Sequence, residues 1–309
     1  MENVLFKVVA LVLMAFVVYS CEKPVIDDDT ASNGAGQEQQ GSQPSNKTTG
    51  NVVLRVSNFN FVPYTSEGSA DARVAKTMTD LTTYCTRLNY VIYKDGKKVA
   101  SRSQLKEDAG FGETTVKLDA GIYKLLVLAH SSKGGNPTLS DPENIQFTNA
   151  LGYSDTFSYY GDLEVTNEVM THEITLTRVS SLLLFTVTDD LPANVTHMYF
   201  YYTGGSGVLN AVTGYGGNVN SKQEKNVNVS GMTSPLAINV YTFLQADEGS
   251  LNLKINALDA NSNVVASRQF SNIPVKRNVV TEFKGSFFKE ESFTFVANTE
   301  WSDTLHFTF

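Results

Sequence analysis

The chain has 309 residues, of which 41% are hydrophobic and 18% charged, and its formal net charge is -8. A mildly acidic chain lacks the basic surface that binding to nucleic acid requires, so we expect no nucleic-acid partner. Two cysteines, Cys21 and Cys85, are present. A dense disulfide framework is therefore excluded, and the folded part must be stable through its core.

The first 20 residues have the pattern of an export signal. An uncharged apolar run, Val8–Val18, follows Lys7 and is too short to span a bilayer as a helix. It ends in Val17-Val18-Tyr19-Ser20-Cys21, which resembles the bacterial lipobox, although Tyr19 is bulkier than usual at its position. That resemblance implies cleavage between Ser20 and Cys21, lipid on Cys21, and attachment to the outer membrane at the cell surface. The alternative is an ordinary secretory signal that leaves Cys21 unmodified.

Residues 21–50 have the composition of a flexible tether. After Asp27-Asp28-Asp29 the segment consists of Ser, Asn, Gly, Gln, Thr and similar residues, without large apolar side chains. Such a segment buries too little surface to offset the entropy of ordering. The acidic residues resemble the surface-export signal of Bacteroidota lipoproteins.

Residues 51–309 have a pattern that predicts short β-strands separated by turns that carry Gly, Asn, Asp and Pro. Asp95-Gly96 between two alternating runs predicts a tight hairpin. The run Leu182–Phe185 is apolar on both faces, which predicts a central strand. We predict an all-β protein with two tandem β-sandwiches, at 51–177 and 178–309, after the signal peptide (1–20) and the tether (21–50).

Several segments, taken in order, resemble one known family. They are Asn89–Lys97, Leu118–Ala129, Leu176–Leu182, Asp190-Leu191-Pro192 and Ile273–Gly285, with Trp301 near the end. Together with the lipobox, this order is similar to the fimbrillin superfamily of Bacteroidota, and most similar to its anchor-type and minor-subunit members. The resemblance implies two transthyretin-like domains and a lipoprotein precursor that becomes a fimbrial subunit involved in adhesion. It also implies neighbouring fimbrial subunits as partners through strand exchange, with host or bacterial surface ligands as further partners. In polymerising members a protease cuts after an arginine and removes the first strand, whereas anchor members stay uncut and lipid-attached.

The segment Val52–Val62 is the candidate for the removable or donated strand. Val52, Leu54 and Val56 form an apolar stripe, and Phe59 and Phe61 continue it if the phase shifts near Asn58, as at a bulge. The polar segment 64–74 that follows is typical of an exposed loop. Arg73 is the candidate cleavage residue, with Val74 as the new amino terminus. Arg55 is less suited because it lies in the predicted strand, and the alternative for Arg73 is an ordinary surface arginine of an uncut anchor.

Nothing in the sequence predicts an enzyme, a metal site or a cofactor. The four histidines have no metal-ligand spacing, and Cys85 is expected to be a buried strand residue. The adjacent carboxylates of Asp189-Asp190 form a poor acid–base pair, because neighbours on a strand point to opposite faces. The alternative function is a surface glycan-binding β-sandwich lipoprotein. The aromatics Tyr201, Tyr202, Tyr215 and Trp301 are available for that role, although core positions are the commoner place for such residues.

Overall fold

The computed structural model describes most of the chain from Thr49 onward. The described residues are 49–60, 76–77, 81–148, 153–217, 222–289, 294–298 and 305–307. By its internal contacts, 46–309 is one compact unit. Several residues singled out in the sequence lie outside the described part: Ser20, Cys21, Phe61, Arg73, Val74 and Trp301.

The fold is all-β, as predicted. In the described residues the only helix is the 3₁₀ turn η1 (Leu81–Thr83), and none there has the length and apolar character needed to cross a membrane. The predicted division at 177/178 falls beside the short connection Val179-Ser180 between two strands. The number of independent domains stays a prediction.

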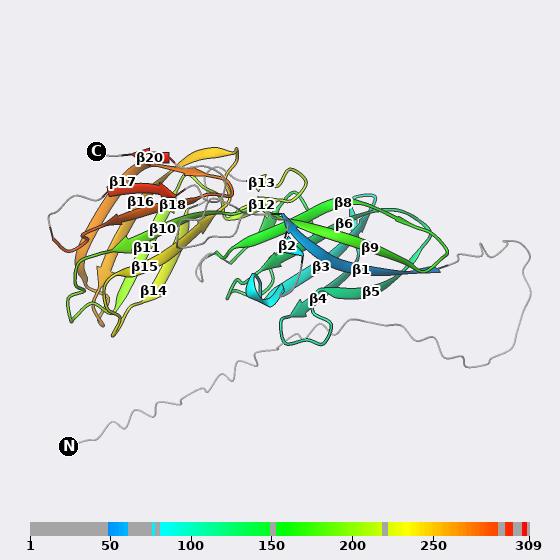
Figure 1. Ribbon diagram of the computed structural model, residues 1–309, viewed down its shortest axis with the longest axis horizontal. Coiled ribbons are helices and arrows are strands. Elements are labelled where there is room, and N and C mark those ends of the chain that lie inside the picture. Colours follow the sequence, from blue (N-terminus) through cyan, green and yellow to red (C-terminus); the bar gives the residue numbers. More distant parts are fainter. Residues whose placement is uncertain are drawn as a thin grey trace, which may run out of the picture. The chain divides into compact units, whose positions relative to one another are not determined.

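The first half of the described chain, up to Arg178, contributes nine strands. They are β1 (Thr49–Asn60), β2 (Lys76–Thr77), β3 (Arg87–Lys94), β4 (Lys97–Leu105), β5 (Glu113–Asp119), β6 (Gly121–His130), β7 (Ile145–Gln146), β8 (Thr156–Val165) and β9 (Met170–Arg178). Strand β1 begins at Thr49 and so includes the last two residues of the predicted tether (21–50). The strands pair in the order β2-β1-β9-β8-β6-β3-β4, with β5 also on β1. The β8–β9 link consists of only two residue pairs, so the sheet bends there into two layers, β5/β2-β1-β9 and β8-β6-β3-β4 (Figure 1).

The second half contributes eleven strands. They are β10 (Ser181–Val187), β11 (His197–Thr203), β12 (Val208–Asn210), β13 (Tyr215–Gly216), β14 (Gln223–Asn228), β15 (Leu236–Thr242), β16 (Glu248–Leu258), β17 (Val264–Lys276), β18 (Val280–Gly285), β19 (Thr294–Asn298) and β20 (Leu305–Phe307). They form the sheets β15-β10-β18-β19-β20 and β14-β11-β16-β17, while β12 pairs with β13 on one side and with β7 of the first half on the other.

The two halves repeat one connection pattern. In each, the first strand lies between an antiparallel and a parallel neighbour: β1 between β5 and β9, and β10 between β15 and β18. In each, the next long strand pairs with two later ones, β3 with β4 and β6, and β11 with β14 and β16. The second half adds β19 and β20 beyond β18.

Two large apolar cores follow from the alternation of the strands. One is built from β1, β5 and β9 on one side and β3, β6 and β8 on the other. The other is centred on β10, β11, β15 and β16 and extends to Val91, Leu126 and Ile145 of the first half. Strand β11 alternates between buried and half-buried residues, whereas β10 is buried on both faces, which confirms the central strand predicted at Leu182–Phe185.

The structure confirms the hairpin turn predicted at Asp95-Gly96, but it places Cys85 outside a strand. The β3–β4 hairpin turns at Asp95 and Gly96, whose φ angles of 51° and 74° are those of the primed turns that Asp-Gly favours. Cys85 is buried, as expected, but it lies between η1 and β3 and not in a strand. The amides of Tyr84 and Cys85 donate to the Leu81 carbonyl at 3.1 and 3.3 Å and close the turn before β3, and the Cys85 thiol donates to the same carbonyl at 3.7 Å.

Candidate functional site

The predicted exchangeable strand is β1, and it occupies the interior of a layer. Residues Thr49–Arg55 pair with β5 from Asp119 back to Glu113, and Asn58-Phe59 pair with β2. Along its other edge β1 runs parallel to β9, from Val52 opposite Met170 to Asn60 opposite Thr177. Figure 1 shows β1 in blue beside β9. Both main-chain edges of the strand are therefore satisfied by the rest of the fold.

The inner face of β1 carries the predicted apolar stripe. Val52, Leu54, Val56 and Phe59 are at most 2% exposed. The register with β9 shifts between Val56 and Asn58, so the predicted change of phase is confirmed. The Phe59 ring packs against Phe157 and Tyr84, with centroids 5.0 and 5.4 Å away.

The groove that receives this stripe is lined by apolar side chains from five strands, β3, β5, β6, β8 and β9. They include Val116 and Leu118 of β5, Ile174 and Leu176 of β9, and residues of β3 and β6 such as Tyr90, Leu125 and Val127. The alternation of Thr114–Leu118 and of Val169–Leu176 predicts strands with one buried face. This alternation does not indicate that β5 and β9 flank β1, because the pairing of strands depends on chain topology and not on local pattern.

On the outer face of β1, Arg55 forms ion pairs with the two neighbouring strands. Arg55 donates from Nε to Glu113 Oε2 at 2.6 Å and from Nη1 to Glu173 Oε1 at 3.0 Å, so it bridges β5 and β9. The hydrogen bond with Glu113, followed by the two negative charges, raises the pKa of Arg55. The side chain is 47% exposed, and solvent therefore screens these pairs. Arg55 lies within the strand, as expected.

The start of the strand has no room for a side chain. A Cβ on Gly50 would lie 2.0 Å from the Thr166 carbonyl oxygen, in the turn between β8 and β9. Only glycine allows the two backbones to come this close. A strand that replaced β1 would need glycine at the same place.

The described residues show no arrangement suited to catalysis. No group of three or more His, Cys, Asp or Glu side chains is placed there to hold a metal ion. Burial raises the pKa of the Cys85 thiol to about 12, which keeps it protonated and unreactive. Asp189 and Asp190 follow β10 outside any strand; Asp189 is buried and Asp190 exposed.

The three tyrosines considered for glycan binding that the structure describes, Tyr201, Tyr202 and Tyr215, have different environments. Tyr202 is fully buried and donates its hydroxyl to the Tyr241 carbonyl at 2.9 Å. Tyr215 is half-buried, with the Arg277 guanidinium 4.5 Å from its ring centroid. Tyr201 is half-buried on β11. The availability of Tyr202 expected from the sequence was therefore wrong, because the side chain fills the core.

A family model covers nearly the whole folded part of this chain. The match is to a family of unknown function, DUF6562, over residues 48–303. The chain belongs to this family. No curated protein matches it in sequence.

Solved structures with a similar fold come from Bacteroidota. One is a proposed adhesin from Bacteroides ovatus, with TM-score 0.47 and 13% identity, covering 76% of this chain and 88% of that one. Another is a proposed polysaccharide-binding protein from Bacteroides thetaiotaomicron, with TM-score 0.47 and 10% identity over 84% and 98%. A third is the fimbrial anchor protein Mfa2 from Porphyromonas gingivalis, with TM-score 0.45 and 10% identity over 84% and 99%.

Proposed function

We propose that this chain is a structural subunit of a cell-surface fimbria, an anchor or minor component, which joins a neighbouring subunit by exchange of a β-strand. The observation that carries the proposal is the position of β1. It is the first strand of the described fold, yet it lies inside a layer and fills a groove with four apolar side chains. A single cut in 61–75 would separate this strand from the rest of the compact unit.

The energetics favour replacement of the strand over an empty groove. Burying each of Val52, Leu54, Val56 and Phe59 stabilises the fold by roughly 1.5–3 kcal/mol, or about 6–12 kcal/mol together, as an upper estimate. A whole domain has only about 5–15 kcal/mol of net stability. Loss of β1 would also leave two open strand edges, on β5 and β9, which pair readily with another strand.

The groove also defines what a donated strand must look like. Its buried positions are filled at residues 52, 54, 56 and 59, because the bulge after Val56 shifts the phase of the strand by one residue. A donor therefore needs apolar side chains at i, i+2, i+4 and i+7, the last of them large. It also needs glycine two residues before the first, to pass the Thr166 carbonyl.

Two processing steps belong to the same proposal. Lipid on Cys21, after cleavage behind Ser20, would hold the protein at the outer membrane through the tether. A cut between Arg73 and Val74 would release β1 and open the groove. An anchor keeps β1 and the lipid, and a polymerising subunit loses both.

The decisive experiment uses limiting trypsin on purified residues 22–309. We expect an early cut that exposes Val74, with Arg73→Gln as the matched resistant variant. After denaturation, removal of the short fragment and refolding, the cut protein should bind a labelled peptide of residues 49–60, and uncut protein should not. A Leu54→Asp peptide should bind at least about tenfold more weakly, because it places a charge in the core. An Arg55→Gln peptide should bind nearly as well as the original.

Equal binding of the Leu54→Asp and original peptides would reject strand exchange at this groove. So would refolding of the cut protein to full stability without any peptide. The amino-terminal residue of protein recovered from cells then separates the two roles. Lipidated Cys21 identifies an anchor, and Val74 a processed subunit.

A further inference from the structure

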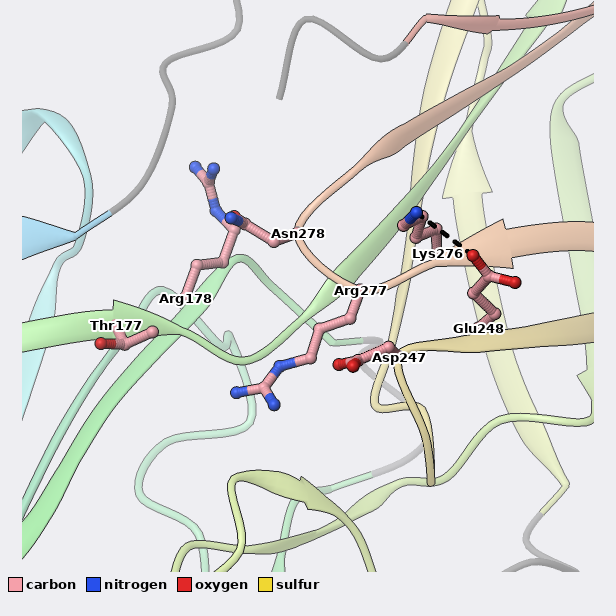
Figure 2. A pocket seen from close by; sticks show the side chains of 7 residues that line it. All are labelled: Thr177, Arg178, Asp247, Glu248, Lys276, Arg277 and Asn278. Carbon is pink, nitrogen blue, oxygen red and sulfur yellow. Dashed lines mark ion pairs between the residues drawn. The ribbon is translucent and has the colours of Figure 1, made fainter. Parts of the chain in front are cut away.

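We propose that a cavity of about 530 Å³ at the junction of β9, β16 and β17 binds an acidic saccharide, a sugar that carries a carboxylate, such as a hexuronate or a sialic acid. The site is separate from the β1 groove, and the proposal does not depend on strand exchange. It is lined by Thr177, Arg178, Asp247, Glu248, Lys276, Arg277 and Asn278 (Figure 2). Its volume is within the range of small-molecule sites.

Three connections bring these side chains together. Thr177 and Arg178 end β9. Asp247 ends the β15–β16 connection and Glu248 begins β16, while Lys276 ends β17 and is followed by Arg277 and Asn278 in the tight turn to β18. The Arg277 amide donates to the Asp247 carbonyl at 2.7 Å, which ties the last two turns together. Two of these segments, Thr177-Arg178 and Lys276–Asn278, are among those that carry the family resemblance in the sequence.

Arg277 is the candidate anion-binding group. Within the described residues its guanidinium has no carboxylate partner, although Arg178 pairs with Asp155 (2.6 Å) and Lys276 with Glu248 (3.2 Å). It lies over the Tyr215 ring at 4.5 Å, and the Tyr215 hydroxyl donates to Asp247 Oδ1 at 2.9 Å. Stacking therefore orients the guanidinium before a ligand arrives. A planar fork of N–H donors held in this way suits two-point binding of a carboxylate.

The rest of the lining selects the remainder of the ligand. None of the described residues that line the cavity has an apolar side chain, so an apolar peptide side chain would lose water there and could pack only against the aliphatic stems of charged residues. Asp247 and Glu248 line the same space as Arg277 and would repel a phosphate dianion or a polyacid. A ligand with one carboxylate and several hydroxyls suits a lining that has both acidic and basic side chains. Its hydroxyls can donate to the carboxylates of the protein and accept from the amide and ammonium groups.

The test is titration of isotope-labelled residues 22–309 with sodium glucuronate and N-acetylneuraminate, followed by NMR. Glucose and acetate serve as the neutral-sugar and bare-anion comparisons. We expect saturable shifts for both acidic sugars, with Kd on the order of 1 mM for such small ligands. Arg277→Ala should weaken binding at least about tenfold, and Arg277→Lys should also weaken it because the fork is lost. Lys254→Ala, which changes an exposed lysine of β16 outside the cavity, should bind as the original protein does.

Four results would overturn the proposal. They are the absence of saturable binding by either acidic sugar, acetate binding as tight as glucuronate, an acidic peptide that binds more tightly than the sugars, and unchanged binding by an Arg277→Ala protein with the original melting temperature. None of them bears on the peptide experiment at the β1 groove, so the two proposals fail independently.

Discussion

Strands β1 and β10 hold the same place in the two halves of the molecule but are fastened differently. Each lies between an antiparallel and a parallel neighbour. Strand β10 follows β9 after two residues and is buried on both faces, whereas β1 is buried on one face and carries Arg55 on the other.

Two carboxylates, the half-buried Asp155 and the buried Asp189, fix the two ends of β10. At its start, Asp155 accepts from Ser180 Oγ at 2.9 Å and from Arg178 Nη2 at 2.6 Å. Past its end, Asp189 accepts from Ser286 Oγ and from the amides of Phe287, Phe288 and Lys289 at 2.7–3.0 Å. On β1, the described residues show the exposed Arg55 pairs and a hydrogen bond from Ser57 Oγ to the Ile174 carbonyl (3.4 Å), all from positions inside the strand and not at its ends. Strands β1 and β10 thus have equivalent places in their sheets, but β10 is held by more side-chain hydrogen bonds at its ends. Strand β1 is therefore the one better suited to exchange.

The largest expected effect compares one phenylalanine from each strand. Phe185 of β10 packs against Phe200, Phe283 and Phe287 with centroids 5.5–6.1 Å away, and Phe59 of β1 packs against Phe157 and Tyr84 at 5.0 and 5.4 Å. We expect Phe185→Ala to lower the free energy of unfolding by about 3–5 kcal/mol and Phe59→Ala to lower it by less. Urea titration followed by amide exchange would assign each loss to a half. The exposed Val264→Ala is the control, and a larger loss for Phe59→Ala would contradict the comparison.

The second prediction is that acid weakens the first half before the second. His130, fully buried in β6, accepts from the Ser132 amide at Nδ1 (3.2 Å), and its Nε2 lies 3.1 Å from Asn89 Oδ1, so the neutral ring fits. Burial, and then the charge of Arg87, lower its pKa to about 4. Between the unfolded value near 6.5 and that folded value, only the unfolded chain binds the proton. Stability is therefore lost as pH falls through this window, by up to about 3 kcal/mol.

Amide exchange at pH 7, 5.5 and 4.5 would show this loss in β3 and β6. His130→Gln should remove most of the slope. A slope that persists in the variant, or that appears first in β10 and β11, would refute the assignment to His130.

Local pattern predicted the strands and the phase of β1, because alternation and turn residues act over a few positions. It placed Val52, Leu54 and Val56 on one buried face, and it marked Leu182–Phe185 as central. It did not show that β1 runs parallel to β9, since that pairing joins residues 118 positions apart, such as Val52 and Met170.

The hydrogen bonds at the ends of β10 and the cavity beside β17 could not be predicted from the sequence either, because both join residues far apart in the chain. Asp189 was considered only as a neighbour of Asp190, yet its partners are about 100 positions later in the chain. The cavity collects side chains from the ends of three strands and the turns beside them, and none of these segments has a motif of its own. Sites of this kind need the pairing of the strands before they can be recognised.

The third prediction removes the carboxylate that closes the end of β10. Burial raises the pKa of Asp189, but hydrogen bonds from Phe287, Ser286, Phe288 and Lys289 outweigh it, and the pKa is lowered. The stability that these bonds give is present above the unfolded value of about 3.9 and is lost as pH falls through the folded pKa. Asp189→Asn should cost about 1–3 kcal/mol at pH 7, because an amide group would face backbone donors. The matched control is Asp190→Asn at the exposed neighbour. Equal effects of the two changes on urea unfolding would show that the hydrogen bonds of Asp189 do not fasten β10.

The smallest effect is expected at Arg55, the counterpart of these carboxylates on β1. Its bonds to Glu113 and Glu173 span three strands, but all three side chains are about half exposed. Arg55→Gln should therefore lower the melting temperature less than Asp189→Asn does. The loss of melting temperature caused by Arg55→Gln should vanish near 1 M salt, where the screening length is about 3 Å. A large loss that persists in high salt would mean that β1 is fixed by its outer face as firmly as β10 is by its ends, and would remove the asymmetry that makes β1 the exchangeable strand.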